Sequence, residues 1–126
     1  MRYARKGFTL IELLVVMSVI ATLLTIAVPR YFQHLDRARE AALRESLAVM
    51  RDAVDKYHGD TGRYPETLED LVTRRYLRKV PPDPITESTE TWVIVPPPDE
   101  PGQKKVWDIR SGAEGQGLNG SAYSSW

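Results

Sequence analysis

Apolar residues dominate one continuous stretch near the start of the chain, between Phe8 and Val28. Of its 21 residues, 13 are Phe, Leu, Ile or Val, and only Glu12 is charged. A helix of about 20 apolar residues spans the hydrocarbon core of a bilayer. Each such residue contributes roughly 0.3 to 0.6 kcal/mol towards insertion, whereas a central carboxylate costs roughly 3 kcal/mol and Glu12 lies near one end. The pattern therefore predicts a membrane-spanning segment.

A cluster of basic residues, Arg2, Arg5 and Lys6, precedes this stretch. Basic residues are retained on the cytoplasmic side of a membrane, so the flank predicts a cytoplasmic N-terminus and a chain that continues beyond the membrane. A secretory signal peptide is the alternative interpretation, but its apolar region is shorter and ends at a site of small residues. Here the run continues into the sequence PRY at residues 29–31. This continuation favours a retained single span.

A second apolar pattern has the period of a helix. Residues 30–58 contain no glycine and no proline, and their apolar side chains recur at intervals of four and three residues, which place them on one helix face. This face consists of Leu43, Leu47, Met50, Val54 and Tyr57. Because no loop signal separates the two stretches, we expect one helix of about 50 residues from Phe8 to about His58, which would be about 75 Å long.

Local signals modify this helix. Pro29 lacks an amide proton and crowds the carbonyl four residues earlier, which predicts a bend near Thr25. Gly59 and Gly62 predict the end of the helix, since glycine readily takes the left-handed conformation of helix ends. Oppositely charged residues four apart predict pairs on the outer faces. These pairs are Glu40 with Arg44 and Asp52 with Lys56.

Three smaller elements are predicted further along. The sequence PETLEDLVTRRYL (65–77) predicts a short helix that Thr67 caps together with Asp70. Its buried residues would be Leu68, Leu71 and Val72. Residues 91–95 and 104–110 are rich in β-forming residues and predict an antiparallel hairpin. From Ser111 onward, glycines and small polar residues predict a loop. We expect Leu118, Tyr123 and Trp126 to tie this loop down.

These elements predict the α+β fold class, with a long N-terminal helix followed by a small domain that contains a short helix and an antiparallel hairpin. About 65 residues form this small domain, and a domain of that size buries a limited fraction of its surface. We therefore expect it to use the apolar face of residues 30–58 as one wall of its core. The segments are 8–29, which spans the membrane, the amphipathic helix 30–58 and the domain 59–126.

Composition argues against catalysis and nucleic-acid binding. Without the first seven residues the chain has 14 basic and 17 acidic side chains, so we expect no nucleic-acid partner. His34 and His58 stand alone, without a second ligand at metal spacing. No phosphate-binding loop or Ser-His-Asp arrangement can be argued from the order of residues. The tryptophans and tyrosines are expected in the core and rim of the domain, and no enzyme is predicted.

The sequence KGFTLIELLVVMSVIATLLTIAVP resembles the N-terminal signature of type IV pilin-like proteins. The resemblance implies that residues 1–7 are a leader peptide, which a membrane-embedded prepilin peptidase removes by cutting between Gly7 and Phe8. It also implies N-methylation of the new Phe8 amine and a pilin fold. An arbitrary small residue before the span is the alternative interpretation of Gly7.

Downstream, GRYPETLEDLV, PPDP, the hairpin, VWDIRSGAEG and the final Trp126 resemble the major pseudopilins (G-type subunits) of type II secretion systems. The resemblance implies a subunit of a periplasmic pseudopilus that polymerises from the inner membrane to drive protein export. Its partners would be membrane lipid before assembly, further copies of itself, minor pseudopilins, the peptidase, and the inner-membrane assembly platform with its ATPase. The alternatives are a subunit of a type IV or competence pilus and a monomeric membrane-anchored binding module.

Glu12 and Pro29 are the assembly residues that this resemblance implies. An intramembrane carboxylate needs a partner, and the resemblance implies that Glu12 meets the Phe8 amine of a neighbouring subunit. The alternative is that Glu12 lies at the depth of the headgroups and reaches them directly. Pro29 either marks the end of the span or loosens the helix so that neighbours pack in a filament.

Two departures from the family pattern concern the domain. Ile85 and Thr86 stand where family members commonly have Trp-Gly. Family members also commonly bind calcium in the C-terminal loop through several aspartates, whereas Glu114 is the only acidic residue after Asp108. Weak oxygen ligands would be Glu114, Asn119 and Ser121, and we expect no calcium and no other cofactor. The chain has no cysteine, which favours a pseudopilin over disulfide-closed pilins.

Overall fold

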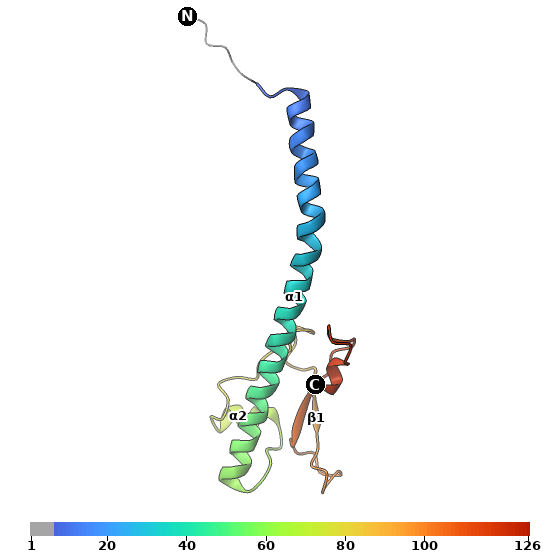
Figure 1. Cartoon of the computed structure of the whole chain (residues 1–126). Coiled ribbons are helices and arrows are strands. Elements are labelled where there is room, and N and C mark those ends of the chain that lie inside the picture. The colour runs from blue at the N-terminus through green and yellow to red at the C-terminus, as the bar shows by residue number, and fades with distance from the viewer. Residues whose placement is uncertain (1–6) are drawn as a thin grey trace, which may run out of the picture. The chain divides into compact units, whose positions relative to one another are not determined.

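The computed structural model describes residues 7–126, so the basic cluster of the leader lies outside the described residues. The chain forms two compact units, which divide between Leu35 and Asp36. The predicted α+β class is confirmed (Figure 1). The elements are α1 (Leu10–Thr61), α2 (Leu68–Thr73), β1 (Trp92–Val95), β2 (Asp108–Ser111) and a short 3-10 helix, η1 (Tyr123–Ser125).

The first unit contains the apolar half of α1. Every side chain from Phe8 to Val28 is exposed, and among the described residues α1 is the helix whose length and composition suit a membrane crossing. Hydroxyl groups within this stretch donate to main-chain carbonyls about one turn earlier, as Ser18 does to Leu14 at 2.7 Å and Thr22 does to Ser18 at 2.8 Å. The stretch thus satisfies these polar groups internally, as a lipid environment requires.

Pro29 lies inside α1, which stays helical on both sides of it. The proline removes one hydrogen bond, the one that the carbonyl of Thr25 would accept. A single missing bond therefore does not divide the helix.

The end of α1 differs from the prediction. The helix continues beyond His58 to Thr61, and Gly59 is a helical residue. Gly62 alone terminates it, with a φ of 73° and an amide that donates to the carbonyl of His58 at 2.8 Å. The hydroxyl of Thr61 donates to the carbonyl of Tyr57 and stabilises the last turn. A glycine is tolerated within a helix, whereas the left-handed position after it strongly favours glycine.

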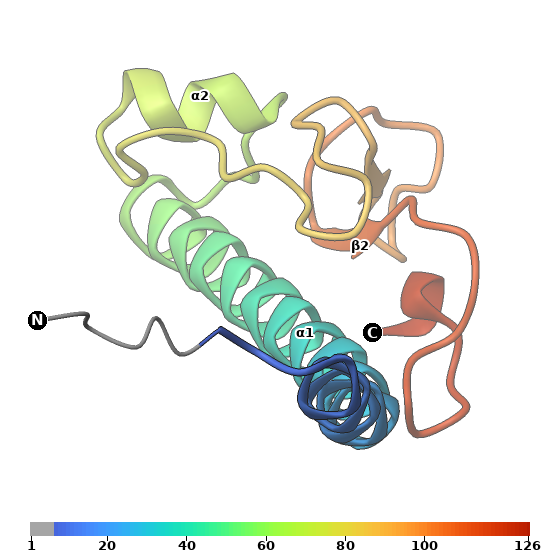
Figure 2. The same cartoon turned by 90° about the horizontal axis from the view of Figure 1, so that it is seen from above.

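The second unit is built on the amphipathic half of α1, as predicted. All five residues of the predicted face are buried, together with Ala53. Figure 2 shows α2, β2 and the C-terminal segment gathered over one side of this part of α1, while its other side is uncovered. The other buried apolar residues of the core are Leu68, Leu71, Leu77, Trp92, Val106 and Ile109. The small domain therefore depends on α1 for one wall of its core.

α2 begins as predicted and ends early. The hydroxyl of Thr67 accepts from the amide of Asp70, and the Asp70 carboxylate accepts from the amide of Thr67, which completes the capping box. The helix ends at Thr73, because Arg75 takes a left-handed conformation with a φ of 65°. The prediction of helix through Leu77 is therefore wrong. Val72 is only half-buried, since the six-residue helix turns two residues, Leu68 and Leu71, fully inward.

β1 and β2 form the predicted antiparallel hairpin, with Trp92 opposite Ser111 and Val95 opposite Asp108. The second strand begins four residues later than predicted. Its expected first half leaves the ladder because the amide of Val106 donates instead to the carbonyl of Pro65, before α2, at 2.8 Å. Val106 is fully buried there, so this segment joins the hairpin to the core.

Candidate functional site

The start of α1 contains the predicted processing and assembly residues. Glu12 is the third residue of α1, and Thr9 is the residue directly before the helix. The amide of Thr9 donates to Oε2 of Glu12 at 3.2 Å, and the amide of Glu12 donates to Oγ1 of Thr9 at 3.1 Å. This reciprocal pair is a capping box, which satisfies two amides at the helix start. Glu12 therefore stabilises its own helix in addition to any partner it meets.

Gly7 and Phe8 lie immediately before this cap. Both are exposed, and 88% of the Phe8 surface is accessible. A Cβ atom added to Gly7 would meet nothing within 4 Å among the described residues, and Gly7 does not take the left-handed conformation. Neither packing nor backbone geometry in the described chain thus requires glycine at this position.

The C-terminal loop, residues 112–126, contains the weak calcium ligands. Glu114 is exposed. Oδ1 of Asn119 accepts from the amide of Ser121 at 3.0 Å and from its hydroxyl at 2.6 Å, and that hydroxyl oxygen accepts from the indole of Trp126 at 2.7 Å. The side-chain oxygens of Asn119 and Ser121 thus accept hydrogen bonds from donors within the loop. In the described part of the chain, no three acidic, histidine or cysteine side chains form a metal-binding group. The residues present do not fit the calcium site that the resemblance implies.

Glu40 of α1 contacts this loop directly. Its Oε1 accepts from the amide of Leu118 at 2.6 Å and from the hydroxyl of Tyr123 at 3.4 Å. Burial, followed by the negative charge of Glu40, raises the pKa of the Tyr123 hydroxyl above its ordinary value. The predicted pairing of Glu40 with Arg44 is wrong, because both side chains reach the loop instead. Asp52 and Lys56 do pair, at 2.8 Å.

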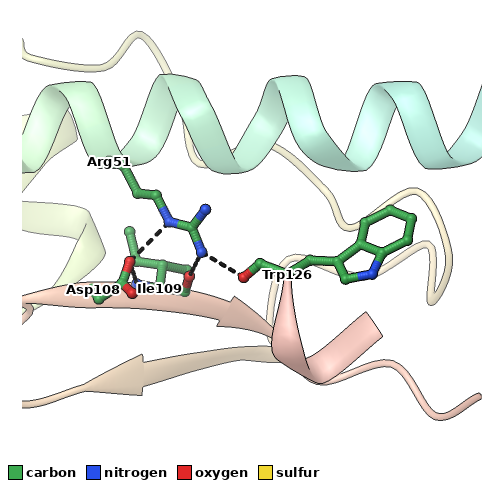
Figure 3. A network of polar contacts seen from close by, with 4 residues as sticks. All are labelled: Arg51, Asp108, Ile109 and Trp126. Atoms are coloured by element: carbon green, nitrogen blue, oxygen red, sulfur yellow. Dashed lines mark hydrogen bonds and ion pairs between the residues drawn. The ribbon is translucent and has the colours of Figure 1, made fainter. Parts of the chain in front are cut away.

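Two further groups connect α1 with the end of the chain. The guanidinium carbon of Arg44 lies 4.3 Å from the centre of the Trp126 ring. Figure 3 shows Arg51, whose Nε donates to Oδ1 of Asp108 at 2.8 Å. Its Nη2 donates to the main-chain oxygens of Ile109 at 2.9 Å and Trp126 at 2.6 Å. One side chain thus joins β2 to the last residue. Tyr123 and Trp126 tie the loop to the core as predicted, whereas the side chain of Leu118 is exposed and does not pack on the core.

A buried carboxylate holds the loop that precedes β1. Asp83 is fully buried, and its Oδ2 accepts from the Ser111 hydroxyl at 2.5 Å. Its Oδ1 accepts from the amide of Ile85 at 2.8 Å. The oxygen of Ser111 in turn accepts from the amide of Ala113. Asp83 therefore connects the proline-rich segment to β2.

Several of these contacts were not predicted from the sequence. Thr9 and Glu12 have the T-x-x-E spacing of a capping box, so the sequence alone could have predicted this cap. The roles of Glu40, Arg51 and Asp83 depend on partners 28 to 83 residues away, for which no local pattern exists.

Comparison with known proteins bears on the whole chain. Residues 2–28 match the family model of the prokaryotic N-terminal methylation motif. The type II secretion system core protein G of Pseudomonas aeruginosa is 29% identical, over 99% of this chain and 97% of that protein. The same-named protein of Klebsiella michiganensis is also 29% identical, over 66% of this chain and 70% of its own length. The fimbrial protein EcpC of Eikenella corrodens is 34% identical over 52% and 42%.

No solved structure is significantly similar to the chain. The resemblance predicted from the N-terminal signature and from the downstream motifs is confirmed by the two kinds of sequence match.

Proposed function

We propose that this chain is a structural subunit of a secretion pseudopilus. It carries the N-terminal methylation motif of type IV pilin-like proteins, and it resembles core protein G of type II secretion systems along nearly its whole length. The observation that carries the proposal is the combination of that full-length similarity with the exposed apolar stretch of α1 up to Val28, which contains one carboxylate, Glu12. An exposed apolar surface of this extent needs lipid or other copies of the same helix to cover it.

In this proposal the subunit begins in the inner membrane with a cytoplasmic N-terminus and a periplasmic C-terminal unit. The basic cluster before the span supports this orientation. The prepilin peptidase cuts between Gly7 and Phe8, and the Phe8 amine is methylated. The absence of an internal reason for glycine at position 7 supports selection by an outside agent, here the peptidase.

Glu12 then pairs with the Phe8 amine of a neighbouring subunit. The capping box engages Oε2 of Glu12 with an uncharged amide, so the carboxylate retains acceptor capacity for a cation. In lipid a charge-neutral pair is far more favourable than two separate ions. Cancelling both charges within the polymer therefore favours assembly and fixes the axial register of neighbours. Pro29 contributes by freeing a main-chain carbonyl that neighbouring protein then covers.

The remaining partners follow from this role. They are minor pseudopilins, the peptidase, and the inner-membrane assembly platform with its ATPase, which supplies the work of polymerisation. The chain itself catalyses no reaction and needs no cofactor.

Substitutions of Glu12 test the proposal, because glutamine retains one function of glutamate and removes the other. Glutamine at the third helix position still completes a capping box, but it carries no charge. Glu12→Gln should therefore leave membrane insertion and helix content unchanged while abolishing pseudopilus formation and exoprotein release. The matched control is Glu45→Gln, at an exposed position of the same helix outside the span. Normal filaments from Glu12→Gln would show that the residue only caps the helix.

A type IV or competence pilus is the second candidate, and the similarity to a fimbrial protein favours keeping it. Deletion of the gene separates the two functions. Loss of exoprotein release with normal twitching and DNA uptake supports the pseudopilus, and the reverse supports the pilus.

A further inference from the structure

The C-terminal loop needs an external support to stay ordered. It contains no cysteine and four glycines, and its regular structure consists of the three-residue η1 and one isolated bridge between Gln116 and Ala122. Its hydrogen bonds between main-chain groups, such as Gly117 to Ser121 and Gly120 to Gly117, lie within the loop. They shape its turns and do not attach it to the rest of the unit.

We propose that three charged side chains of α1, Glu40, Arg44 and Arg51, hold the C-terminal loop against the helix and make its order independent of calcium. They are spaced four and seven residues apart, which places them on one stripe of the helix. Hereafter they are called the charged stripe. The proposal holds for the fold itself and does not depend on the proposed function.

The charges at Glu40 are arranged in the opposite way to those of a calcium site, where oxygen atoms surround a cation. Calcium requires six to eight oxygen atoms directed at one point. Around Oε1 of Glu40 the loop instead directs two protons, from the amide of Leu118 and the hydroxyl of Tyr123. A negative oxygen occupies the central position, and the loop supplies donors. The same atoms cannot simultaneously surround a cation.

The loop backbone packs closely against Glu40 at Gly117. A Cβ atom added to Gly117 would lie 3.0 Å from Oε1 of Glu40 and would overlap the ring of Trp126. Gly117 therefore lets the loop backbone approach both side chains. The ring of Trp126 also contacts Tyr123 edge to face at 5.1 Å between centroids.

Arg44 and Arg51 secure the last residue of the loop at two points. Arg44 lies over the Trp126 ring, in the geometry of a cation–π contact. Arg51 donates to the main-chain oxygen of Trp126 and forms an ion pair with Asp108 at 2.8 Å. A planar guanidinium fixes several acceptors at once, which a single ammonium group cannot do in the same geometry.

Hydrogen exchange of the full-length chain in detergent micelles tests the proposal. Loop amides, followed in peptides from residues 112–126, should exchange at the same rate in excess calcium and in excess EDTA, and the thermal midpoint should not move. Glu40→Gln should accelerate exchange at Leu118 by about tenfold, because the charged acceptor of the Leu118 amide is replaced by a neutral and weaker one. Arg44→Lys should accelerate loop exchange about threefold through loss of the guanidinium stack.

The control is Glu45→Gln, at an exposed position on the same helix, which should exchange like the wild type. Slower loop exchange in calcium, or a thermal midpoint raised by several degrees, would overturn calcium independence. Unchanged loop exchange in Glu40→Gln would overturn the support by the charged stripe. If that variant fails to fold, Arg44→Lys and the wild-type calcium titration still decide the question.

Discussion

Replacement of the buried carboxylate of Asp83 by an amide should destabilise the domain by about 2 kcal/mol. Asp83 accepts from the Ser111 hydroxyl at 2.5 Å and from the amide of Ile85 at 2.8 Å. Hydrogen bonds to charged groups contribute about 1.5 to 3 kcal/mol each and neutral ones about 1 kcal/mol. Asp83→Asn weakens both bonds, and its NH₂ group faces an oxygen that already accepts from the amide of Ala113. Relief of carboxylate burial offsets part of this loss.

Unfolding in urea, followed by tryptophan fluorescence in detergent micelles, measures this change. Trp92 is a suitable probe because it is buried and its indole donates to the carbonyl of Pro81, two residues before Asp83. A small domain loses about 1 to 3 kcal/mol of stability per molar urea, so the midpoint should fall by about 1 M. Such a shift is a large part of a total stability of about 5 to 15 kcal/mol.

The partner of the carboxylate provides the control. Ser111→Ala removes the same hydroxyl contact from the other side, so the two substitutions should not add. In a double-mutant cycle we expect a coupling energy of about 1 kcal/mol between Asp83 and Ser111. Additivity within about 0.3 kcal/mol would refute the reasoning, since it would mean that the contact contributes no energy of its own.

Three further predictions concern other parts of the chain. Gly112→Ala should destabilise the domain by about 1 to 3 kcal/mol in the same urea assay, because the new methyl group would overlap the carbonyl of Thr91. Asp60, which accepts from the Tyr76 hydroxyl at 2.7 Å, raises the pKa of Tyr76 above 10.0. Stability from this bond is present below pH 10 and lost as the pH rises further, so Tyr76→Phe should flatten the alkaline limb of a stability profile. Gly7→Leu should leave an uncleaved precursor on an immunoblot.

Matched variants serve as controls for these predictions. Gly102→Ala should be neutral, because its added Cβ meets nothing within 4 Å in residues 7–126. Tyr31→Phe should leave the urea midpoint unchanged, since Tyr31 is 65% exposed. Equal loss of stability in both glycine variants, an alkaline limb that Tyr76→Phe does not alter, or normal processing of Gly7→Leu would contradict the respective argument.

The sequence predicted the features that depend on regular spacing. The apolar face from Leu43 to Tyr57 and the Thr67 capping box are confirmed, because each follows from helix geometry within a few residues. The antiparallel hairpin is also confirmed, but its second strand is shorter than predicted. The residue at which this strand begins depends on the distant contact between Val106 and Pro65, which alternating residues do not encode.

Long-range polar contacts could not be predicted from local patterns. Glu40 and Arg44 have the spacing of a helix ion pair, yet both contact the C-terminal loop about 80 residues away. The loop offers Glu40 an amide and a half-buried hydroxyl, whereas an exposed ion pair contributes little. The same limit applies to Asp83, whose neighbouring prolines predict irregular structure and say nothing about its partner Ser111.

The most direct test is the distance between two groups in the native polymer. We predict that a density map of filaments isolated from cells places the Glu12 carboxylate within about 4 Å of the Phe8 nitrogen of an adjacent subunit, as an ion pair requires. A separation on the order of 10 Å, at which the pair no longer compensates buried charge, would contradict the account.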